Sequence, residues 1–410
     1  NIRLMDTPEE QEKKLFNEKK IAAEEFARVN RIDKIGFPKI NSKIGLIAAG
    51  KNWLDLIHAF SLLGIDARDA EELGITSYKI VQTWPIDRQS LLEWSDQLDL
   101  IIVVEEKRKI IETQVKDTLF SVGSKTRVYG GDKNNEKLFS DHGVLDPLDI
   151  ASAIGQIFQE EGCSNTKLTS GLKKIKEARS ADNAPDLAER LPYFCAGCPH
   201  NSSTVVPEGS RAYAGIGCHY MAQWMDRETL GFTHMGGEGA NWIGESLFSK
   251  RKHVFQNIGD GTYNHSGIQA IRAAVAAKTD ITYKILFNDA VAMTGGQGND
   301  GHLNAVRVVK ELLAIGIKNT ILVYDDKEDL SLNSFPKEIE KVDRSKLNYA
   351  QEKLSKISGV TAIVYVQTCA AEKRRRRKRG RFPDPDKRLF INTDVCEGCG
   401  DCGIQSNCVA

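Results

Sequence analysis

The chain has 410 residues, of which 41% are hydrophobic, so it is long enough to bury the cores of two or three domains. Its 56 basic and 56 acidic residues cancel, which excludes an overall positive field that would draw the protein to nucleic acid or a membrane surface. The longest apolar stretch, residues 98–104, is far shorter than the roughly 20 residues of a membrane span, and no secretory signal opens the sequence, so we expect a cytoplasmic protein.

The first part of the chain predicts a helical leader and then an α/β domain. Residues 1–42 are charged and weakly periodic, as in an exposed helix that leads into a loop. From residue 43 onward, short apolar runs alternate with amphipathic segments, which is typical of parallel strands connected by helices. The elements expected in this first domain, 43–163, are strands at 43–50, 78–84 and 98–106 and helices at 52–63, 87–98 and 108–120.

A polar, weakly periodic segment, 164–190, is expected to link this domain to a second one. The second domain, 191–370, repeats the α/β pattern. Its expected strands lie near 253–258, 281–287, 320–324 and 362–367, and its helices begin near Ser266, Ala305 and Lys337. Residues 371–410 are read as a basic linker and the start of a small Cys-rich segment. The predicted fold class is therefore α/β, with two domains of mainly parallel sheet and a short Cys-rich tail.

The motif Gly-Asp-Gly at 259–261 is followed, after one helix and one strand, by Asn288. Right-handed crossovers bring the carboxyl ends of neighbouring parallel strands together, so Asp260 and Asn288 should lie at one edge of the second sheet. Gly259 and Gly261 admit close backbone approach, and the helix that follows favours phosphate at its N-terminus. Carboxylate, amide and carbonyl oxygens suit Mg²⁺, which leaves positions for phosphate oxygens. The motif thus predicts a Mg²⁺–diphosphate site, and the alternative is an ordinary turn.

Clustered cysteines in a cytoplasmic chain indicate metal or redox chemistry rather than disulfide bonds. The first group lies in the second domain and comprises Cys195, Cys198, Cys218 and Cys369. Four thiolates suit a 4Fe-4S cluster. Three of them together with His200 or His219 would suit a zinc ion, so the zinc alternative stays open.

The second group has the spacing C-x2-C-x2-C-x5-C in the tail and comprises Cys396, Cys399, Cys402 and Cys408. Its first three members match the spacing of ferredoxin clusters, whereas the usual fourth ligand follows after three residues and precedes a proline. The role of Cys408 is therefore uncertain from the spacing, and a zinc knuckle is the alternative. Cys163 has no evident partner and is read as structural.

Taken together, these motifs resemble the 2-oxoacid:ferredoxin oxidoreductases, a family of thiamine diphosphate enzymes. The signature Gly-Asp-Gly followed by Asn is similar to the thiamine diphosphate motif, and the first cysteine group is similar to the set that holds one 4Fe-4S cluster in that family. The stretches CAGCPHNSST, GIGCHYM and GGEGANWIG, with the Cys-rich end, look most like the long, fused indolepyruvate ferredoxin oxidoreductases. The similarity extends over nearly the whole chain beyond residue 43, and its first domain looks like the transketolase carboxyl-terminal type.

The resemblance implies a role for each matching residue. Asp260 and Asn288 would be side-chain ligands of Mg²⁺, and Ala290 would contribute its main-chain oxygen. The residues that the resemblance places around thiamine diphosphate are Gly236, Gly237, Gly259, Asp260, Gly261, Asn288, Ala290, Met293 and Thr294.

The activity that the resemblance implies is oxidative decarboxylation of a 2-oxoacid, indolepyruvate or another arylpyruvate, to its acyl-coenzyme A. Electrons would pass one at a time through the 4Fe-4S clusters to ferredoxin. No G-x-G-x-x-G follows a predicted strand, so nothing indicates a nicotinamide route. The family's activating Glu belongs to a pyrimidine-binding domain for which residues 1–42 are too short. We therefore expect an internal segment of a longer chain, or one that needs this domain in cis or in trans, and a homodimer of the full enzyme.

Residues 373–381, KRRRRKRGR, include eight basic residues in nine. The charge of such a run by itself predicts binding to polyanions, although nucleic acid is not the partner we expect. Its position next to Cys369 suggests a linker close to acidic ferredoxin or to the phosphates of coenzyme A. The alternatives for the whole chain are a catalytically idle iron–sulfur scaffold and a zinc-organised protein that binds nucleic acid.

Overall fold

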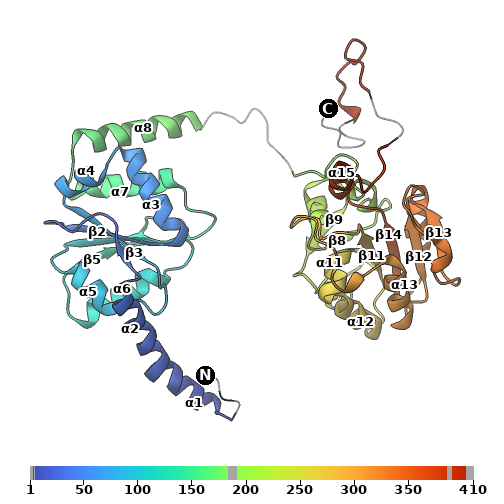
Figure 1. The fold of residues 1–410 in the computed structure, drawn as a ribbon, viewed down its shortest axis with the longest axis horizontal. Helices are drawn as coiled ribbons and strands as arrows, with labels where there is room; N and C mark the ends of the chain where they lie inside the picture. Colours follow the sequence, from blue (N-terminus) through green and yellow to red (C-terminus); the bar gives the residue numbers. More distant parts are fainter. Residues whose placement is uncertain (1–2, 4, 183–191, 386–389, 403–410) are drawn as a thin grey trace. The chain divides into compact units, whose positions relative to one another are not determined.

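The computed structural model describes residues 3, 5–182, 192–385 and 390–402. The chain divides into two compact units, Asn1–Leu187 and Ala188–Ala410 (Figure 1). Each unit contains one large, mainly parallel sheet with helices on both faces, which confirms the predicted fold class. Among the described residues, no helix combines the length and the apolar character that crossing a bilayer requires.

The first unit is built on a five-stranded sheet in the order β1-β3-β2-β4-β5. All neighbouring strands are parallel except that β1 is antiparallel to β3. The central strands are buried almost throughout, which explains why they are nearly continuous apolar runs in the sequence. The strands are β1 (Lys34–Ile35), β2 (Ile44–Ala49), β3 (Ile75–Ile80), β4 (Leu100–Val104) and β5 (Arg127–Tyr129).

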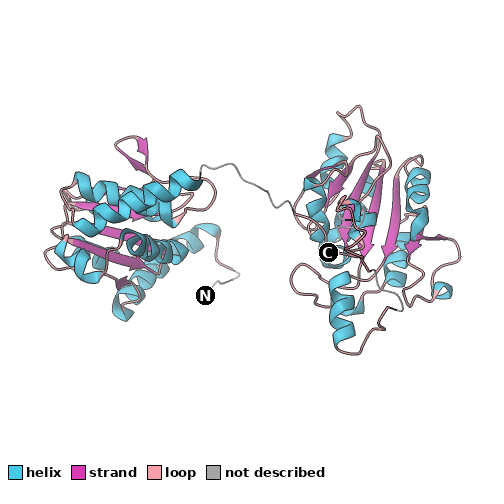
Figure 2. Cartoon of the chain, turned by 90° about the horizontal axis from the view of Figure 1, so that it is seen from above, coloured by secondary structure: helices cyan, strands magenta, loops and turns pink. Residues whose placement is uncertain are grey.

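Helices cover both faces of this sheet (Figure 2). One face packs against α3 (Gly50–Leu63), α7 (Pro147–Glu160) and α8 (Thr166–Asp182), and the other packs against α5 (Arg88–Ser95) and α6 (Ile110–Ser121). The shorter elements are α1 (Pro8–Lys14), the π-helix η1 (Leu15–Lys19), α2 (Lys20–Asn30), α4 (Ala67–Glu72), β6 (Asp132–Lys133) and β7 (Glu136–Lys137).

Helix α8 corrects the expectation that 164–190 is a linker. Most of this segment is helical and belongs to the first unit, where Leu168 and Ile175 are buried in the core. The polar composition concealed the helix because only one narrow face, which these two residues share with Leu172, is apolar. The remainder of the expected linker, 183–190, lies outside the described residues.

The second unit is built on a seven-stranded parallel sheet in the order β13-β12-β14-β11-β10-β8-β9. Its three middle strands carry the predicted site: Asp260 follows β10, Asn288 follows β11, and Cys369 comes shortly after β14. The strands are β8 (Ala212–Ala214), β9 (Thr229–Phe232), β10 (Val254–Gly259), β11 (Ile281–Phe287), β12 (Thr320–Tyr324), β13 (Glu340–Asp343) and β14 (Val360–Val366).

One face of this sheet packs against α10 (Ala240–Glu245), α12 (Ile268–Ala276) and α13 (Ala305–Ala314), and the other packs against α14 (Leu347–Leu354). The shorter helices are α9 (His200–Ser203), η2 (Cys218–Trp224), α11 (Asp260–Thr262), the π-helix η3 (Tyr263–Gly267), η4 (Asp300–His302), η5 (Leu332–Ser334) and η6 (Arg344–Lys346).

The helix expected to begin near Lys337 does not begin there. The chain first adds β13 at the edge of the sheet, and the helical turns start only after Asp343. The Asp343 carboxylate accepts a hydrogen bond from the main-chain N–H of Ser345 at 2.9 Å and so caps the start of η6, which leads into α14.

The basic run also differs from its expected form, because residues expected to be a linker form helix α15 (Ala370–Lys378). Arg and Lys are good helix formers once their charges are paired. Lys373 pairs with Glu328 at 2.6 Å and Arg376 pairs with Asp289 at 2.8 Å, and both acids come from distant parts of the chain.

Strand β11 carries a fully buried lysine, Lys284. Its Nζ donates hydrogen bonds to Oε1 of Gln351 at 2.7 Å and to the main-chain oxygen of Val205 at 3.2 Å. Both acceptors are neutral, and burial lowers the pKa of Lys284 to about 7. The lysine therefore ties the sheet to the segments on one of its faces without a compensating carboxylate.

This buried lysine predicts a pH-dependent stability. Between pH 7 and its ordinary value of 10.5, the unfolded chain holds a proton on Lys284 that the folded chain has released. The free energy of unfolding should therefore rise with pH in this window, by up to about 1.4 kcal/mol per pH unit. Urea unfolding at several pH values should show that Lys284→Met removes this rise, whereas Lys310→Met, at an exposed position, keeps it. Equal pH slopes in the two variants would contradict the prediction.

Candidate functional site

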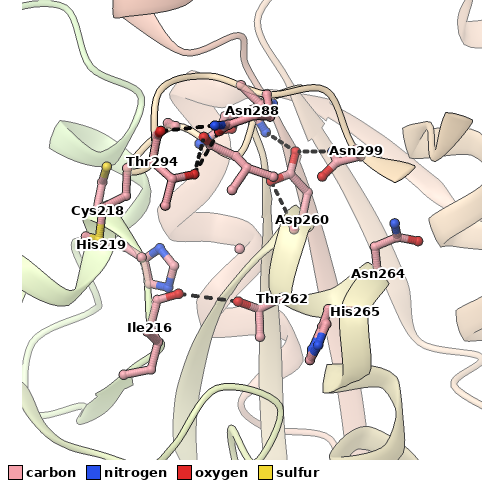
Figure 3. A pocket seen from close by; sticks show the side chains of 18 of the residues that line it. Ile216, Cys218, His219, Asp260, Thr262, Asn264, His265, Asn288, Thr294 and Asn299 are labelled. Carbon is pink, nitrogen blue, oxygen red and sulfur yellow. Dashed lines mark hydrogen bonds between the residues drawn. The ribbon is translucent and has the colours of Figure 1, made fainter. Parts of the chain in front are cut away.

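A cavity of about 580 Å³ lies at the carboxyl ends of β10 and β11, and all of its lining residues belong to the second unit (Figure 3). The sequence-predicted residues that the structure places in its lining are Gly259, Asp260, Gly261, Asn288, Ala290, Met293 and Thr294. Asp260 and Asn288, which the crossover geometry placed at one edge of the sheet, therefore line the same cavity. Gly236 and Gly237 are not part of the lining, although the adjacent Met235 is.

Asp260 is the most constrained group in this cavity and is only 2% exposed. Its Oδ2 accepts hydrogen bonds from the main-chain N–H groups of Asn288 at 3.2 Å and Asp289 at 2.9 Å, and its Oδ1 accepts one from Gly261 at 2.9 Å. Burial raises the pKa of Asp260 to about 6, and the hydrogen bonds oppose the rise. Because no described cation pairs with it, the carboxylate would be stabilised by a bound positive ion.

Asn288 and Ala290 supply two further oxygens beside this carboxylate. Asn288 is 7% exposed, and its Oδ1 accepts a hydrogen bond from the N–H of Ala290 at 3.2 Å. The carbonyl oxygen of Ala290 accepts no hydrogen bond from any described residue. The set of carboxylate, amide and carbonyl oxygens is the kind that Mg²⁺ binds, so the residues present fit that ion.

Asn299 belongs to the same group and was missed by the sequence reasoning. Its Nδ2 donates to Oδ2 of Asp260 at 3.1 Å, and its Oδ1 is buried without a partner in the described structure. Figure 3 shows Asp260, Asn288 and Asn299 together at one end of the cavity. The only signal in the sequence was an Asn in a Gly-rich loop, which is too common to single out.

The segment around Gly236 folds over a buried carboxyl group. Gly236 has φ +91° and donates its N–H to Oε2 of Glu238 at 2.7 Å. A Cβ at Gly236 would overlap the hydroxyl of Ser266, so the position requires glycine. Glu238 is fully buried, and burial raises its pKa. Glu238 is a second polar residue that the sequence reasoning did not select.

Two buried histidines, His200 and His219, also line the cavity, and the ring of His219 lies next to Gly259. The ring centroids of His200 and His219 lie 5.5 Å apart in an edge-to-face arrangement. Burial lowers the pKa of His200 to about 4 and that of His219 to about 3, so both rings are neutral at pH 7. Nε2 of His219 is buried and has no hydrogen-bond partner among the described residues. His265 also lines the cavity, and its Nδ1 lies 2.7 Å from the Ser266 hydroxyl.

The first cysteine group lies beside this cavity. Burial raises the pKa of the Cys198 thiol to about 12, and electrostatic repulsion from Cys369, Cys195 and Cys218 adds to the rise, so the four thiols are neighbours. Cys218 lines the cavity itself. The main-chain N–H of Cys369 donates to the carbonyl oxygen of Asn288 at 3.0 Å.

The arrangement of these thiols bears on the kind of metal they could hold. In the described part of the chain, no three His, Cys, Asp or Glu side chains converge on a point that could hold one ion. The zinc alternative requires such convergence, with each ligand about 2.0–2.3 Å from one ion. In a 4Fe-4S cluster each thiolate binds a different iron, so the ligands surround a larger group.

The structure describes only three members of the second cysteine group. Cys396, Cys399 and Cys402 are exposed, and Cys408 lies outside the described residues.

Basic residues of α15 line a second cavity, of about 550 Å³, beside the loop between Cys195 and Cys198. This cavity concentrates positive charge, although the whole chain is neutral. Its lining is Ala196, Gly197, Ala370, Lys373, Arg374, Arg377, Lys378 and Asp384.

Each unit of the chain matches a known protein family. Residues 34–182 match the family described as indolepyruvate oxidoreductase domain, and residues 215–331 match the C-terminal TPP binding domain of thiamine pyrophosphate enzymes. The first match ends at the last residue of α8, in agreement with the place of this helix in the first unit.

Two relatives illustrate the extent of the similarity. The indolepyruvate oxidoreductase subunit IorA of Thermococcus kodakarensis is 23% identical over 400 residues, which cover 91% of this chain and 56% of the relative. The subunit IorA of Archaeoglobus fulgidus is 27% identical over 273 residues, which cover 63% of this chain and 39% of the relative. The chain thus spans about half the length of the curated relatives it matches.

Proposed function

Because the chain belongs to the 2-oxoacid:ferredoxin oxidoreductase family, we propose that its second unit binds thiamine diphosphate through Mg²⁺ and takes part in the oxidative decarboxylation of a 2-oxoacid. One observation carries this proposal. Asp260 and Asn288 follow adjacent parallel strands and line one cavity, within a segment that matches a thiamine pyrophosphate-binding domain.

In this proposal the described residues bind and orient the coenzyme. Side-chain oxygens of Asp260 and Asn288 and the carbonyl oxygen of Ala290 would hold Mg²⁺, an ion that leaves coordination positions for phosphate oxygens. Thiamine diphosphate supplies the electron sink that makes loss of carbon dioxide from a 2-oxoacid feasible. Met293 and Thr294 would lie against the diphosphate, and the neutral ring of His219 would form part of the cavity wall.

The first cysteine group would hold a 4Fe-4S cluster as the first electron acceptor. Cys218 lines the coenzyme cavity and Cys369 is hydrogen-bonded to Asn288, so two of the proposed cluster ligands adjoin the proposed coenzyme site. Such a cluster accepts one electron at a time, as electron delivery to ferredoxin requires. The tail cysteines at 396, 399, 402 and 408 would hold a second cluster that relays these electrons.

The substrate and the acyl acceptor are proposed on the basis of the relatives. The relatives named indolepyruvate oxidoreductase favour an arylpyruvate, and coenzyme A would receive the acyl group. The cavity beside the cysteine loop offers the ammonium group of Lys378, which pairs with no acid among the described residues, to the phosphates of coenzyme A. The activating Glu would come from a pyrimidine-binding domain in cis or in trans.

The proposal predicts electron transfer that depends on both coenzyme and substrate. Anaerobic protein, reconstituted with iron, sulfide and the pyrimidine-binding partner, should lose visible cluster absorption on addition of indolepyruvate, and pyruvate should act more slowly. Omission of thiamine diphosphate should prevent the loss. Clusters that stay oxidised although thiamine diphosphate binds would support the idle scaffold instead.

A further inference from the structure

Helix α15 connects the cysteine group to the loop that follows β11. The helix begins directly after Cys369, and the N–H of Cys369 donates to the carbonyl oxygen of Asn288 at 3.0 Å. The loop, residues 288–297, carries Asn288 and Ala290 at its start and continues along the cavity. The beginning of the helix and the beginning of the loop are therefore held together by main-chain atoms.

Arg376 holds the first turn of this loop. Its Nη2 donates to Oδ2 of Asp289 at 2.8 Å and to the carbonyl oxygen of Asp289 at 3.4 Å. Asp289 stands between two proposed metal-binding residues and has φ +59°, a left-handed conformation that is uncommon for a residue with a side chain. Such a conformation persists when surrounding contacts enforce it, and Arg376 makes two of those contacts.

Arg375 holds the far end of the same loop. Its Nη1 donates to the carbonyl oxygen of Gly295 and to Oε1 of Glu372, a residue that is 8% exposed. Gly296 has φ +79°, and a Cβ there would overlap both Glu372 and Arg375. Loop and helix therefore touch without space for even one methyl group.

We propose that Arg375 and Arg376 are positioning residues that hold loop 288–297 in its coenzyme-binding shape, and that α15 thereby couples binding of the coenzyme to the state of Cys369. This inference rests on the proposed function, because it assigns the loop to Mg²⁺ and diphosphate. Coupling of two sites is reciprocal: if the helix orders the loop, an occupied loop also orders the helix and its first residues.

The same helix provides a matched control. Arg374 is exposed and pairs with no acid among the described residues, and it carries the same charge as its neighbours Arg375 and Arg376. A purely electrostatic effect of the basic run on an anionic ligand would be reduced equally by loss of any of these arginines. Positioning through contacts, in contrast, requires Arg376 and not Arg374.

The first test is titration of the full chain, free of iron, with thiamine diphosphate and Mg²⁺ by isothermal calorimetry. Arg376→Ala should weaken binding about 10-fold or more, the size typical of losing a residue that supports a metal ligand, and Arg374→Ala should not. Exchange of the charges, Arg376→Asp with Asp289→Arg, should recover part of the loss. Equal affinities of the two alanine variants would overturn the inference. A wild-type chain that does not bind the coenzyme would overturn the proposed function, and the inference with it.

The second test measures the coupling through the thiol. In iron-free protein, thiamine diphosphate with Mg²⁺ should slow the alkylation of Cys369 by iodoacetamide about 5-fold or more, the lower end of usual coupling between sites. The effect should be lost in Arg376→Ala at coenzyme concentrations that saturate that variant. Cys163, in the first unit, serves as the internal reference whose rate stays constant. Alkylation of Cys369 that ignores the coenzyme in wild type would refute the coupling.

Discussion

Replacement of Asp260 by alanine is expected to weaken the binding of thiamine diphosphate and Mg²⁺ by at least about 100-fold. Loss of a residue that merely supports a metal ligand costs about 10–100-fold, and Asp260 is a proposed ligand itself. It also anchors the loop, because its Oδ2 accepts the main-chain N–H groups of Asn288 and Asp289 and the side-chain amide of Asn299. The variant therefore loses both the only proposed charged ligand and the group that orders the others. Calorimetric titration of the full chain measures the effect.

Asp300→Ala provides the matched control. Asp300 also lines the cavity, but it is exposed and its carboxylate has no partner among the described residues. Its removal changes the charge of the cavity by the same amount and should reduce affinity only slightly. If Asp260→Ala and Asp300→Ala bind alike, general electrostatics rather than coordination explains the binding, and the assignment of the metal site is wrong.

Substitution of Cys198 or Cys369 by serine is expected to remove one whole iron–sulfur cluster. Both thiols belong to the neighbouring group of four, and a cubane that loses one of its four thiolates is destabilised. After anaerobic reconstitution, each variant should contain about four iron and four sulfide ions fewer per chain than wild type, with a matching loss of visible absorption. Iron, labile sulfide and zinc are determined on the same samples.

Two further substitutions make the result interpretable. Cys163→Ser should retain the wild-type content, because Cys163 packs against the core of the first unit, whereas the first cysteine group belongs to the second unit. Cys396→Ser should affect the tail cluster alone. Stoichiometric zinc without sulfide in the wild-type chain would refute the cluster and favour the Cys3His alternative.

The central part of the fold could be predicted because burial leaves a direct trace in the sequence. Strands β4 and β11 are covered on both faces, so they are continuous apolar runs, apart from Thr282 and Lys284. Asp260 and Asn288 could be paired across 28 residues because parallel crossovers fix which strand ends meet. For the same reason Cys369, after β14, could be placed in the second domain near the other cysteines.

Features that depend on contacts between segments distant in sequence could not be predicted from the sequence pattern. Asn299 reaches Asp260 through a loop whose length obeys no periodicity, and Arg376 is one of several arginines that look alike until Asp289 pairs with it. Helix α8 was hidden because its apolar face is narrow. In each case the role of the residue or helix depends on a contact partner that is distant in sequence and comes near only in the folded chain.

Strands β10, β11 and β14, from which Asp260, Asn288 and Cys369 emerge, occupy the middle of the seven-stranded sheet. Amide hydrogens of central strands exchange with solvent last, because they open only when the whole unit unfolds. Fraying at the outer strands β9 and β13 thus leaves the three anchor points in place. A chain stripped of its ligands keeps their relative arrangement, so reloading is limited by ligand encounter rather than by refolding.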